Sequence, residues 1–314
     1  MNVSVTVISY NSAATIIETL DSILAQDYNT KKIELIISDD ASTDNCVDII
    51  DQWLSQHKSS FYKVNFIQNE KNKGVTGNCN TAWRAATCDW IKPIAGDDVL
   101  KPNCISDNVD YVQSHPECRI VFSKMQWFGN MNKITPSPYD LRFFKVNSQK
   151  QNNWLKVFSF NIAPSAFMNK KVLEAVGYAD EKIKSLEDLP LWLKITKAGY
   201  KLYFLDKVTV KYRVSESISM SSHRYVNIKF LKDLIAINKS QKELFFKSPI
   251  NEILRNEQLL MYNSVLLISV ISGNNKNKLT DFLGRTTWAL RPIHLIQRIK
   301  FKTYNAYIHK RHNY

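Results

Sequence analysis

Residues 1–100 alternate between β-branched apolar runs and segments in which apolar side chains recur every three or four positions. An unbroken apolar run bounded by polar residues is typical of a buried strand, and the longer spacing is typical of an amphipathic helix. Strands that alternate with helices favour a mostly parallel sheet covered on both faces, and therefore the α/β class. The strands predicted here are Val3–Ser9, Ile33–Ser38, Lys63–Ile67 and Trp90–Ile94, with a helix after each of the first three, the third over about 78–86.

Beyond Pro116 the pattern is less regular. Pro136–Gln151 is polar and has no period, which indicates irregular structure. Glu187–Ala198 has helical spacing and precedes Gly199, a residue type favoured just after a helix C-terminus. Further strands are predicted at Arg119–Ser123, Lys201–Leu205 and Lys207–Tyr212, the last two separated by Asp206.

A serine-rich segment, residues 215–222, precedes a basic remainder with helical spacing. We therefore expect an α/β domain over 1–221 and a helical region over 222–314. The longest apolar stretch of the chain, Leu259–Ile271, is too short for a membrane span, which needs about 20 residues, and it predicts a buried helix. No basic residue precedes the first apolar run, so no signal peptide is expected.

Composition excludes several classes of protein. With 314 residues, 44% of them hydrophobic and 23% charged, the chain can form a substantial core and is not generally disordered. Its five cysteines form no CxxC pair, which argues against a disulfide scaffold or a four-cysteine zinc module and indicates reduced thiols in the cytoplasm. The patterns GxGxxG, GxxxxGK[ST] and GxSxG are absent from the sequence, so a bound phosphate must be held in another way.

The net charge of +13 is concentrated at one end of the chain. Residues 225–314 contain 15 Lys and Arg against 5 Asp and Glu, whereas residues 1–224 contain 27 against 24. Basic and apolar residues interleave at helical spacing around 229–247 and 295–302, which is typical of amphipathic basic helices. This pattern has two interpretations. The basic residues are either an ordinary solvated surface or a surface that attracts an anionic membrane or nucleic acid. No nucleic-acid motif is found, so no nucleic-acid partner is expected.

Pairs of carboxylates mark three points of the chain. Asp39-Asp40 follows the second predicted strand, Asp97-Asp98 follows the fourth, and Glu187-Asp188 begins a later helix. Parallel sheets bind ligands at the carboxyl ends of their strands. Carboxylates can hold Mg²⁺ or Mn²⁺ together with substrate phosphates, and one at hydrogen-bond distance can take a proton from a hydroxyl. Each pair by itself also fits a structural role as a turn, a helix cap or a first-turn charge.

The order and spacing of these pairs resemble those of the family 2 inverting glycosyltransferases with a GT-A fold. The resemblance runs from Val3 to about Ser221. It implies a nucleotide-diphospho-sugar transferase fold with a mostly parallel central sheet, followed here by a C-terminal helical region. The segments similar to the family's motifs are Val3–Asn11, Leu20–Tyr28, Ile36–Asp44, Asn72–Val75 with Asn80, Ala95–Pro102, Leu186–Leu193 and Tyr212-Arg213.

The resemblance also implies a role for each matching position. Asp98 is expected to coordinate a divalent cation, Mn²⁺ or Mg²⁺, that bridges the diphosphate, with Asp97 assisting. Asp188 is expected to be the catalytic base, and Glu187 to position or contact the acceptor. An inverting enzyme needs one such base, not the catalytic pair of a retaining glycosidase. The residues expected to bind the nucleotide are Ser9, Tyr10, Asn11, Asp39, Asp40, Gly74 and Asn80, with Asp40 on the base.

Two positions depart from the family's pattern. Ala95 stands where the usual DxD motif has its first carboxylate, so one metal contact is lost and the number of protein ligands is open. Val214-Ser215 stands where many relatives have a His soon after the Tyr-Arg pair. His223 is either a substitute ligand or an ordinary surface residue.

The expected reaction transfers a hexose or N-acetylhexosamine from a nucleotide-diphosphate sugar, expected to be UDP-linked, to a hydroxyl of a glycan or an undecaprenyl-diphosphate-linked acceptor. The resemblance implies the synthesis of O-antigen or capsule as the setting. Because the acceptor of such an enzyme is linked to a lipid diphosphate, we also expect the basic C-terminal region to attach the protein peripherally to the cytoplasmic face of the inner membrane. Two other interpretations stay open. A nucleotidyltransferase on a related sheet would have a Gly-rich loop with Lys or Arg after its first strand, and residues 9–15 have neither. A nucleic-acid-binding protein would use the basic C-terminal region, with steeply salt-dependent binding.

Overall fold

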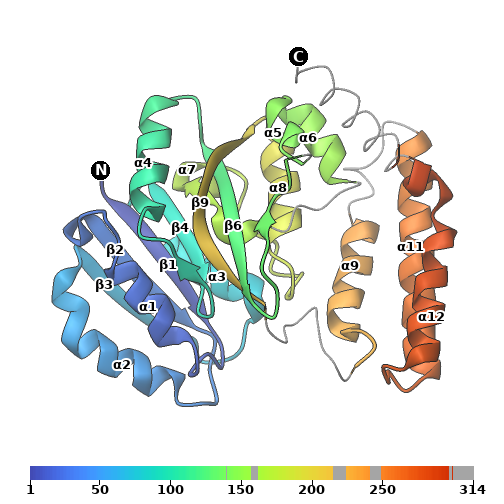
Figure 1. Ribbon diagram of the computed structural model, residues 1–314, viewed down its shortest axis with the longest axis horizontal. Coiled ribbons are helices and arrows are strands. Elements are labelled where there is room, and N and C mark those ends of the chain that lie inside the picture. Colours follow the sequence, from blue (N-terminus) through green and yellow to red (C-terminus); the bar gives the residue numbers. More distant parts are fainter. Residues whose placement is uncertain (139, 157–161, 215–223, 241–248, 297–298, 300–314) are drawn as a thin grey trace. The chain divides into compact units, whose positions relative to one another are not determined.

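The computed structural model describes residues 1–138, 140–156, 162–214, 224–240, 249–296 and 299 (Figure 1). The chain divides into two compact units, Met1–Val214 and Ser215–Tyr314. The serine-rich segment and His223 lie outside the described residues, so the domain boundary at 221/222 and the role of His223 stay predictions.

Four parallel strands form one half of the sheet in the N-terminal unit, in the order β3-β2-β1-β4. Every residue of β2 is buried, and all but one of β1. Burial on both faces explains why these strands are unbroken apolar runs in the sequence. The four predicted strands are confirmed to within one residue, as β1 (Val3–Ser9), β2 (Ile33–Asp39), β3 (Lys63–Gln68) and β4 (Trp90–Ala95).

Three helices connect these strands, namely α1 (Ile16–Leu24), α2 (Cys46–His57) and α3 (Gly74–Ala85). α1 and α2 pack against each other, and α3 packs against β1 and β2. α3 begins earlier than the predicted residue 78. Its first turn is fixed by contacts with a distant carboxylate, described below, which the spacing of apolar residues does not reveal.

The other half of the sheet mixes strand directions. The order continues β4-β8-β6-β9-β5, and β7 pairs with β6. β6 and β9 form a long parallel ladder, whereas the pairs that involve β5, β7 and β8 are short and antiparallel. The predicted α/β fold with a mostly parallel sheet is therefore confirmed. The strands are β5 (Val99–Leu100), β6 (Ile120–Gly129), β7 (Ile134–Thr135), β8 (Phe167–Asn169) and β9 (Leu202–Val214).

The prediction of two short strands around Asp206 is wrong, because β9 is continuous through this residue. Ser123 of β6 is in register with Leu205, but the next residue, Lys124, is in register with Val208. The bulge in β9 takes up Asp206 and its neighbour without ending the strand. In the sequence, polar residues at a bulge therefore look the same as polar residues at a turn between two strands.

The prediction of irregular structure over Pro136–Gln151 is also wrong, since α5 (Arg142–Lys145) and the start of α6 (Ser148–Leu155) lie within it. Asn147 caps α6, with its Oδ1 accepting a hydrogen bond from the Lys150 N–H at 3.0 Å. The other helices of this unit are α4 (Cys104–Ser114), α7 (Lys170–Ala175) and α8 (Asp188–Lys197).

The described part of the C-terminal unit is helical, with α9 (Ile228–Ser240), α11 (Pro249–Ile271) and α12 (Lys278–Thr286) (Figure 1). Among the described helices, no apolar segment is long enough to cross a membrane. Leu254 and Met261 of α11 are buried, but Leu260, Leu267 and Ile271 are 52%, 60% and 77% exposed. The prediction of a buried helix over Leu259–Ile271 is therefore wrong for one face of α11.

The carboxyl ends of β1, β2 and β4 lie side by side in the N-terminal unit. Ser9 at the end of β1 is in register with Asp39 of β2, and Ile8 is in register with Ala95 of β4. The turns that follow these strands meet at one edge of the sheet, the usual ligand-binding edge of such folds.

Candidate active site

The turns after β1 and β2 are joined by hydrogen bonds. Ser9 Oγ donates to Asp39 Oδ2 at 2.8 Å, and the same carboxylate accepts from the Ser42 N–H at 2.8 Å and the Ser42 hydroxyl at 2.6 Å. Asn11 donates its N–H to Ser42 Oγ and accepts at Oδ1 from the Thr43 N–H, each at 2.8 Å. The structure therefore brings Ser9, Asn11 and Asp39 together, and Asp39, which is 1% exposed, holds the two turns in place.

Tyr10 lies on the same turn, and its side chain is 49% exposed. An exposed aromatic ring at this edge offers a flat surface for stacking on a nucleotide base. Tyr10 therefore differs from its buried neighbours Ser9 and Asp39 in having a ring that a ligand can reach.

Asp40 holds the first turn of α3. Its carboxylate accepts from the backbone N–H groups of Lys73 and Gly74, both at 2.8 Å, and from Asn69 Nδ2 at 3.3 Å. A carboxylate in this position also interacts favourably with the helix dipole. Its own N–H donates to Ser9 O at 2.9 Å, so Asp40 ties α3 to the edge of the sheet. Its expected contact with a base stays a prediction.

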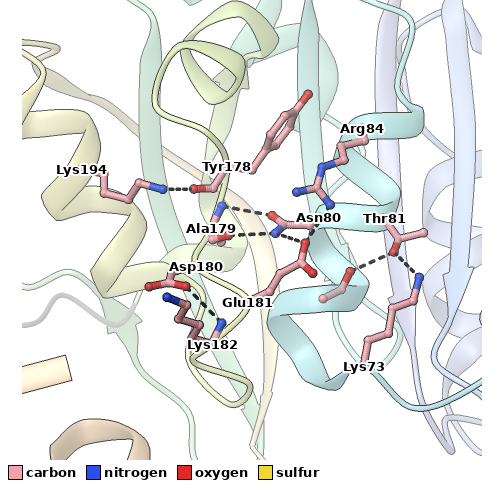
Figure 2. Close-up of polar contacts among 11 residues, drawn as sticks. Lys73, Asn80, Thr81, Arg84, Tyr178, Ala179, Asp180, Glu181, Lys182 and Lys194 are labelled. Carbon is pink, nitrogen blue, oxygen red and sulfur yellow. Dashed lines mark hydrogen bonds and ion pairs between the residues drawn. The ribbon is translucent and has the colours of Figure 1, made fainter. Parts of the chain in front are cut away.

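Gly74 and Asn80 hold the chain that leads to α8. Gly74 has a φ of +79°, and a Cβ there would lie 2.7 Å from Lys184 O. Asn80 is fully buried, and Figure 2 shows its amide between α3 and the residues before α8. Its Nδ2 donates to Ala179 O at 2.9 Å and Glu181 Oε1 at 2.8 Å, and its Oδ1 accepts from the Ala179 N–H at 3.1 Å. The expected role of both residues in nucleotide binding stays a prediction.

The Asp97-Asp98 turn follows β4 and is bound to β9. Arg213 donates its backbone N–H to Asp98 Oδ1 and its Nε to Asp97 O, each at 2.8 Å, and its guanidinium forms an ion pair with Glu18. Asp98 is 1% exposed, and its Oδ2 has no hydrogen-bond partner among the described residues. Burial and the adjacent Asp97 raise the pKa of Asp98 well above its usual value, and burial raises the pKa of Asp97.

The unpartnered oxygen of Asp98 fits a divalent cation. A buried carboxylate oxygen without a donor is unfavourable, and a cation would supply the missing partner. Within the described residues, no three His, Cys, Asp or Glu side chains converge on one point. Such an ion would therefore depend on Asp98 and Asp97 together with the oxygens of a diphosphate, an arrangement common for Mg²⁺ and Mn²⁺.

The Glu187-Asp188 pair lies at the start of α8 and lines a pocket that also includes Ala95 at the end of β4. Burial and then the charge of Asp188 raise the pKa of Glu187 to about 8, and burial raises the pKa of Asp188. Raised carboxyl pKa values in a mainly apolar pocket are typical of acid–base sites. The rest of the lining is Ile8, Cys79, Trp83, Pro93, Ile94, Ala163, Pro164, Met168, Leu191 and Trp192.

Tyr212 lies within electrostatic reach of both pairs. Burial and the charges of Asp98, Asp97, Asp188 and Glu187, in that order, raise the pKa of its phenol to about 12. The pocket beside Glu187 and Asp188 reaches Ala95, two residues before Asp97, so the two pairs, which are far apart in the sequence, lie near one another. With a pKa of about 12, the phenol of Tyr212 is neutral at physiological pH.

Three residues at this site are not among those predicted to form it. Tyr212 and Arg213 stand out in the sequence only as the end of a motif. Lys92 is fully buried in β4, and its ammonium donates to the carbonyls of Pro93 at 3.1 Å, Ala166 at 3.2 Å and Pro164. A lysine inside an apolar strand was the signal available in the sequence. It secures a wall of the pocket.

Comparison with known proteins identifies the family. Residues 4–177 match the family model described as glycosyl transferase family 2, which is more than half of the chain. The protein therefore belongs to this family and is a glycosyltransferase. This membership decides against the nucleotidyltransferase interpretation.

Two relatives have names that indicate their activity. The chain is 28% identical over 215 residues to the Bacillus subtilis protein named as glycosyltransferase EpsE, a match that covers 67% of this chain and 72% of that protein. It is 27% identical over 249 residues to the Escherichia coli UDP-Glc:α-D-GlcNAc-diphosphoundecaprenol β-1,3-glucosyltransferase WfaP, which covers 78% of this chain and 88% of WfaP.

Solved structures show the same fold. Staphylococcus aureus TarS 1–349 in complex with UDP-GlcNAc superposes with a TM-score of 0.61 at 20% identity, over 84% of this chain and 72% of TarS 1–349. The mannosyltransferase PcManGT of Pyrobaculum calidifontis, in complex with GDP-Man and Mn²⁺, gives 0.59 at 17% identity, over 95% of this chain and 87% of PcManGT. The predicted GT-A architecture is confirmed by this likeness.

Proposed function

We propose that this glycosyltransferase is metal-dependent and inverting, and that it transfers a hexose or N-acetylhexosamine to a hydroxyl of a lipid-linked glycan in surface-polysaccharide synthesis. The observation that carries the proposal is the proximity of two acidic pairs. Glu187-Asp188 at the start of α8 lines a pocket that reaches Ala95 at the end of β4, and Asp97-Asp98 lies in the turn just after Ala95. The first pair suits a cation and a diphosphate, and the second suits the proton of an acceptor hydroxyl.

The proposed donor is a nucleotide-diphosphate sugar, with UDP as the nucleotide. TarS in complex with UDP-GlcNAc and PcManGT with GDP-Man support this class of donor, and the name of WfaP supports a diphosphoundecaprenol-linked acceptor. The nucleotide would lie at the joined turns of β1 and β2, against Ser9, Tyr10, Asn11, Asp39 and Asp40. Gly74 and Asn80 would act on this site through the backbone they hold.

In the proposed mechanism Asp98, assisted by Asp97, holds Mn²⁺ or Mg²⁺, which when bound would act as a Lewis acid on the diphosphate. Asp188 accepts the proton of the acceptor hydroxyl while the hydroxyl oxygen forms a bond to the anomeric carbon. The bond from that carbon to the diphosphate oxygen breaks on the opposite face, and the nucleoside diphosphate leaves with the bonding electron pair. The configuration at the anomeric carbon is thereby inverted.

The two carboxyls of the second pair take different roles. With a pKa of about 8, Glu187 keeps its proton at pH 7, so Asp188 can carry the negative charge that a base requires. Neutral Glu187 can donate a hydrogen bond to the acceptor and hold it beside Asp188. The raised pKa of Asp188 makes it a stronger base than an ordinary aspartate.

A panel of UDP-, GDP- and dTDP-sugars, assayed with Mn²⁺ or Mg²⁺ and a diphosphoundecaprenol-linked acceptor, tests this proposal. We expect turnover of one donor, with inversion of the anomeric centre seen by NMR, and its loss in Asp98→Asn or with EDTA. The matched control is Asp206→Asn, because Asp206 is 65% exposed and pairs with Lys124 away from both acidic pairs. Full activity of Asp98→Asn, or turnover in EDTA, would contradict the proposed metal site.

We also propose that the C-terminal unit attaches the enzyme to an anionic membrane at the cytoplasmic face. Exposed apolar side chains lie at the end of α11 and on α12, with Ile271 77%, Leu279 64% and Phe282 63% exposed. Lys278 and Arg285 are exposed on the same helix as Leu279 and Phe282. Apolar side chains beside basic ones fit the interface of an anionic bilayer, where each basic residue contributes about 1 kcal/mol.

Flotation of the full chain with phosphatidylglycerol-containing vesicles tests the attachment. We expect binding that weakens in pure phosphatidylcholine and in Ile271→Asp/Phe282→Asp. Ile134→Asp is the control, because Ile134 is an exposed apolar residue of the N-terminal unit, 53% accessible. Equal flotation of all three proteins, or none, would contradict the proposed attachment.

A further inference from the structure

One face of α3 binds the segment that leads to the proposed catalytic carboxylates. Thr76, Asn80 and Arg84 recur every four residues and therefore lie in one row along the helix. Each of them contacts the chain between Tyr178 and Lys184, here called the 178–184 segment. Figure 2 shows Asn80 and Arg84 reaching from α3 to this segment.

Asn80 is the centre of this row. Its amide makes the two-way hydrogen bond with Ala179 described above and also donates to Glu181. Glu181 Oε1 also accepts from Arg84 Nη1 at 2.7 Å, and the Arg84 guanidinium lies 5.1 Å from the centroid of the Tyr178 ring. The Arg84 side chain is 51% exposed, so its ion pair contributes little, whereas the two bonds between Asn80 and Ala179 are buried.

Thr76 fixes the far end of the segment. Its Oγ1 donates to Ile183 O at 2.5 Å, and its N–H donates to Lys184 O at 3.3 Å. Glu187 follows only a few residues later. The 178–184 segment is thus bound along three successive turns of α3 just before the chain reaches the acidic pair.

The same helix is bound to the donor edge of the sheet. The Asp40 carboxylate accepts the N–H groups of Lys73 and Gly74 at its N-terminus, and Cys79 and Trp83 of α3 line the pocket with the acidic pair. α3 therefore touches both parts of the site. A side chain that fixes the 178–184 segment to α3 therefore also fixes the distance between the donor-binding edge and the acidic pair.

We propose that Asn80 is a positioning residue, which sets the place of Glu187 and Asp188 relative to the donor-binding edge. This inference rests on the proposed function, in which Asp188 is the base. Asparagine suits the role because a single amide supplies two donors and an acceptor. Its removal would leave the N–H and carbonyl of Ala179 unpaired, and the segment would be free to shift.

Hydrogen–deuterium exchange of the full chain tests the structural part of the inference without requiring activity. The variant is Asn80→Ala, and the matched control is Asn108→Ala. Asn108 is also fully buried, but its Nδ2 donates to Cys104 O at 2.7 Å within its own helix. We expect faster exchange over residues 178–190 in Asn80→Ala alone. Equal exchange of these residues in both variants would overturn the proposal.

Kinetics test the functional part. In Asn80→Ala we expect kcat to fall on the order of 100-fold, as for a small misplacement of a catalytic group, while the Kd for UDP changes by less than about threefold. Asn108→Ala is expected to retain kcat at a comparable loss of Tm. A loss of kcat no larger than that of the control would overturn the role of Asn80, whereas a wild type that uses no donor would contradict the proposed function.

A second pair of variants covers the case in which Asn80→Ala does not fold. Asn80→Asp places two carboxylates together at Glu181 and removes the donor to Ala179 O. Adding Glu181→Gln restores a hydrogen bond between residues 80 and 181, now donated by residue 181, but does not restore the one to Ala179 O. We expect the double variant to recover part of the slow exchange of residues 178–190 and part of kcat. No recovery relative to Asn80→Asp alone would overturn the proposal.

Discussion

Glu187→Gln is expected to stabilise the protein at high pH and much less at low pH. Folding raises the pKa of Glu187 from 4.5 to about 8, first because the side chain is buried and second because Asp188 lies beside it. The native state therefore binds this proton more tightly than the unfolded chain does. Stability falls as the pH rises from about 4.5 to about 8, and the full penalty is present above pH 8.

The size of the effect follows from the two pKa values. At about 1.36 kcal/mol for each pH unit, the difference corresponds to about 5 kcal/mol in the free energy of unfolding. Most of the Glu187 side chain is buried but the residue keeps some contact with solvent, and screening by this solvent reduces the expected gain to roughly 2–3 kcal/mol at pH 8.5. A neutral amide of the same shape removes the charge without opening a cavity, so this gain is the expected result for Glu187→Gln.

Urea denaturation of the wild type and Glu187→Gln at pH 5 and pH 8.5 measures the effect. Glu174→Gln is the control, because the Glu174 side chain is 50% exposed and pairs with Lys170 on the surface. Its stability is expected to change by less than about 0.5 kcal/mol at either pH. No gain for Glu187→Gln at pH 8.5, or an equal gain at both pH values, would refute the reasoning about this carboxyl.

Three further predictions concern the residues that support the site. Gly74→Ala is expected to lower the free energy of unfolding by about 2 kcal/mol in urea titrations, because Gly74 has a positive φ and lies close to Lys184 O. Unchanged stability would show that the backbone adjusts to the added Cβ at no cost. Asp39→Ala removes the acceptor of three hydrogen bonds and is expected to cost about 2–4 kcal/mol by thermal unfolding and to weaken UDP binding; an unaltered Tm would contradict its role in joining the turns. Tyr212→Phe is expected to leave the pH–rate profile between pH 6 and about 9 unchanged, since the phenol has a pKa of about 12; a shifted alkaline limb would indicate that it titrates in catalysis.

The first half of the sheet could be predicted because its strands are buried on both faces and are therefore unbroken apolar runs. The continuity of β9 through Asp206 could not, because a bulge places polar residues inside a strand just as a turn would. The exposed face of α11 was missed for a related reason. Its apolar residues are consistent with a buried helix. The sequence does not reveal that, within the described structure, no other element packs over Leu267 and Ile271 and that both are exposed.

The acidic pairs could be found from the sequence because they stand at strand ends and a helix start, in the order typical of the family. The supporting residues could not. Asn80 bonds to Ala179, 99 residues further along the chain, and Asp98 accepts from Arg213 at a separation of 115. No local pattern relates such partners, so the contacts by which Asn80 and Gly74 support the chain before α8 could not be predicted.

The most direct test of the account is a comparison of UDP binding and sugar transfer in Asp188→Asn. We predict that the Kd for UDP stays within about threefold of the wild type, while kcat falls by about 10²–10⁴-fold, because the acceptor hydroxyl loses the group that takes its proton. Asp206→Asn, measured in parallel, is expected to retain both. An Asp188→Asn variant that transfers sugar at the wild-type rate would contradict the assignment of Asp188 as the catalytic base.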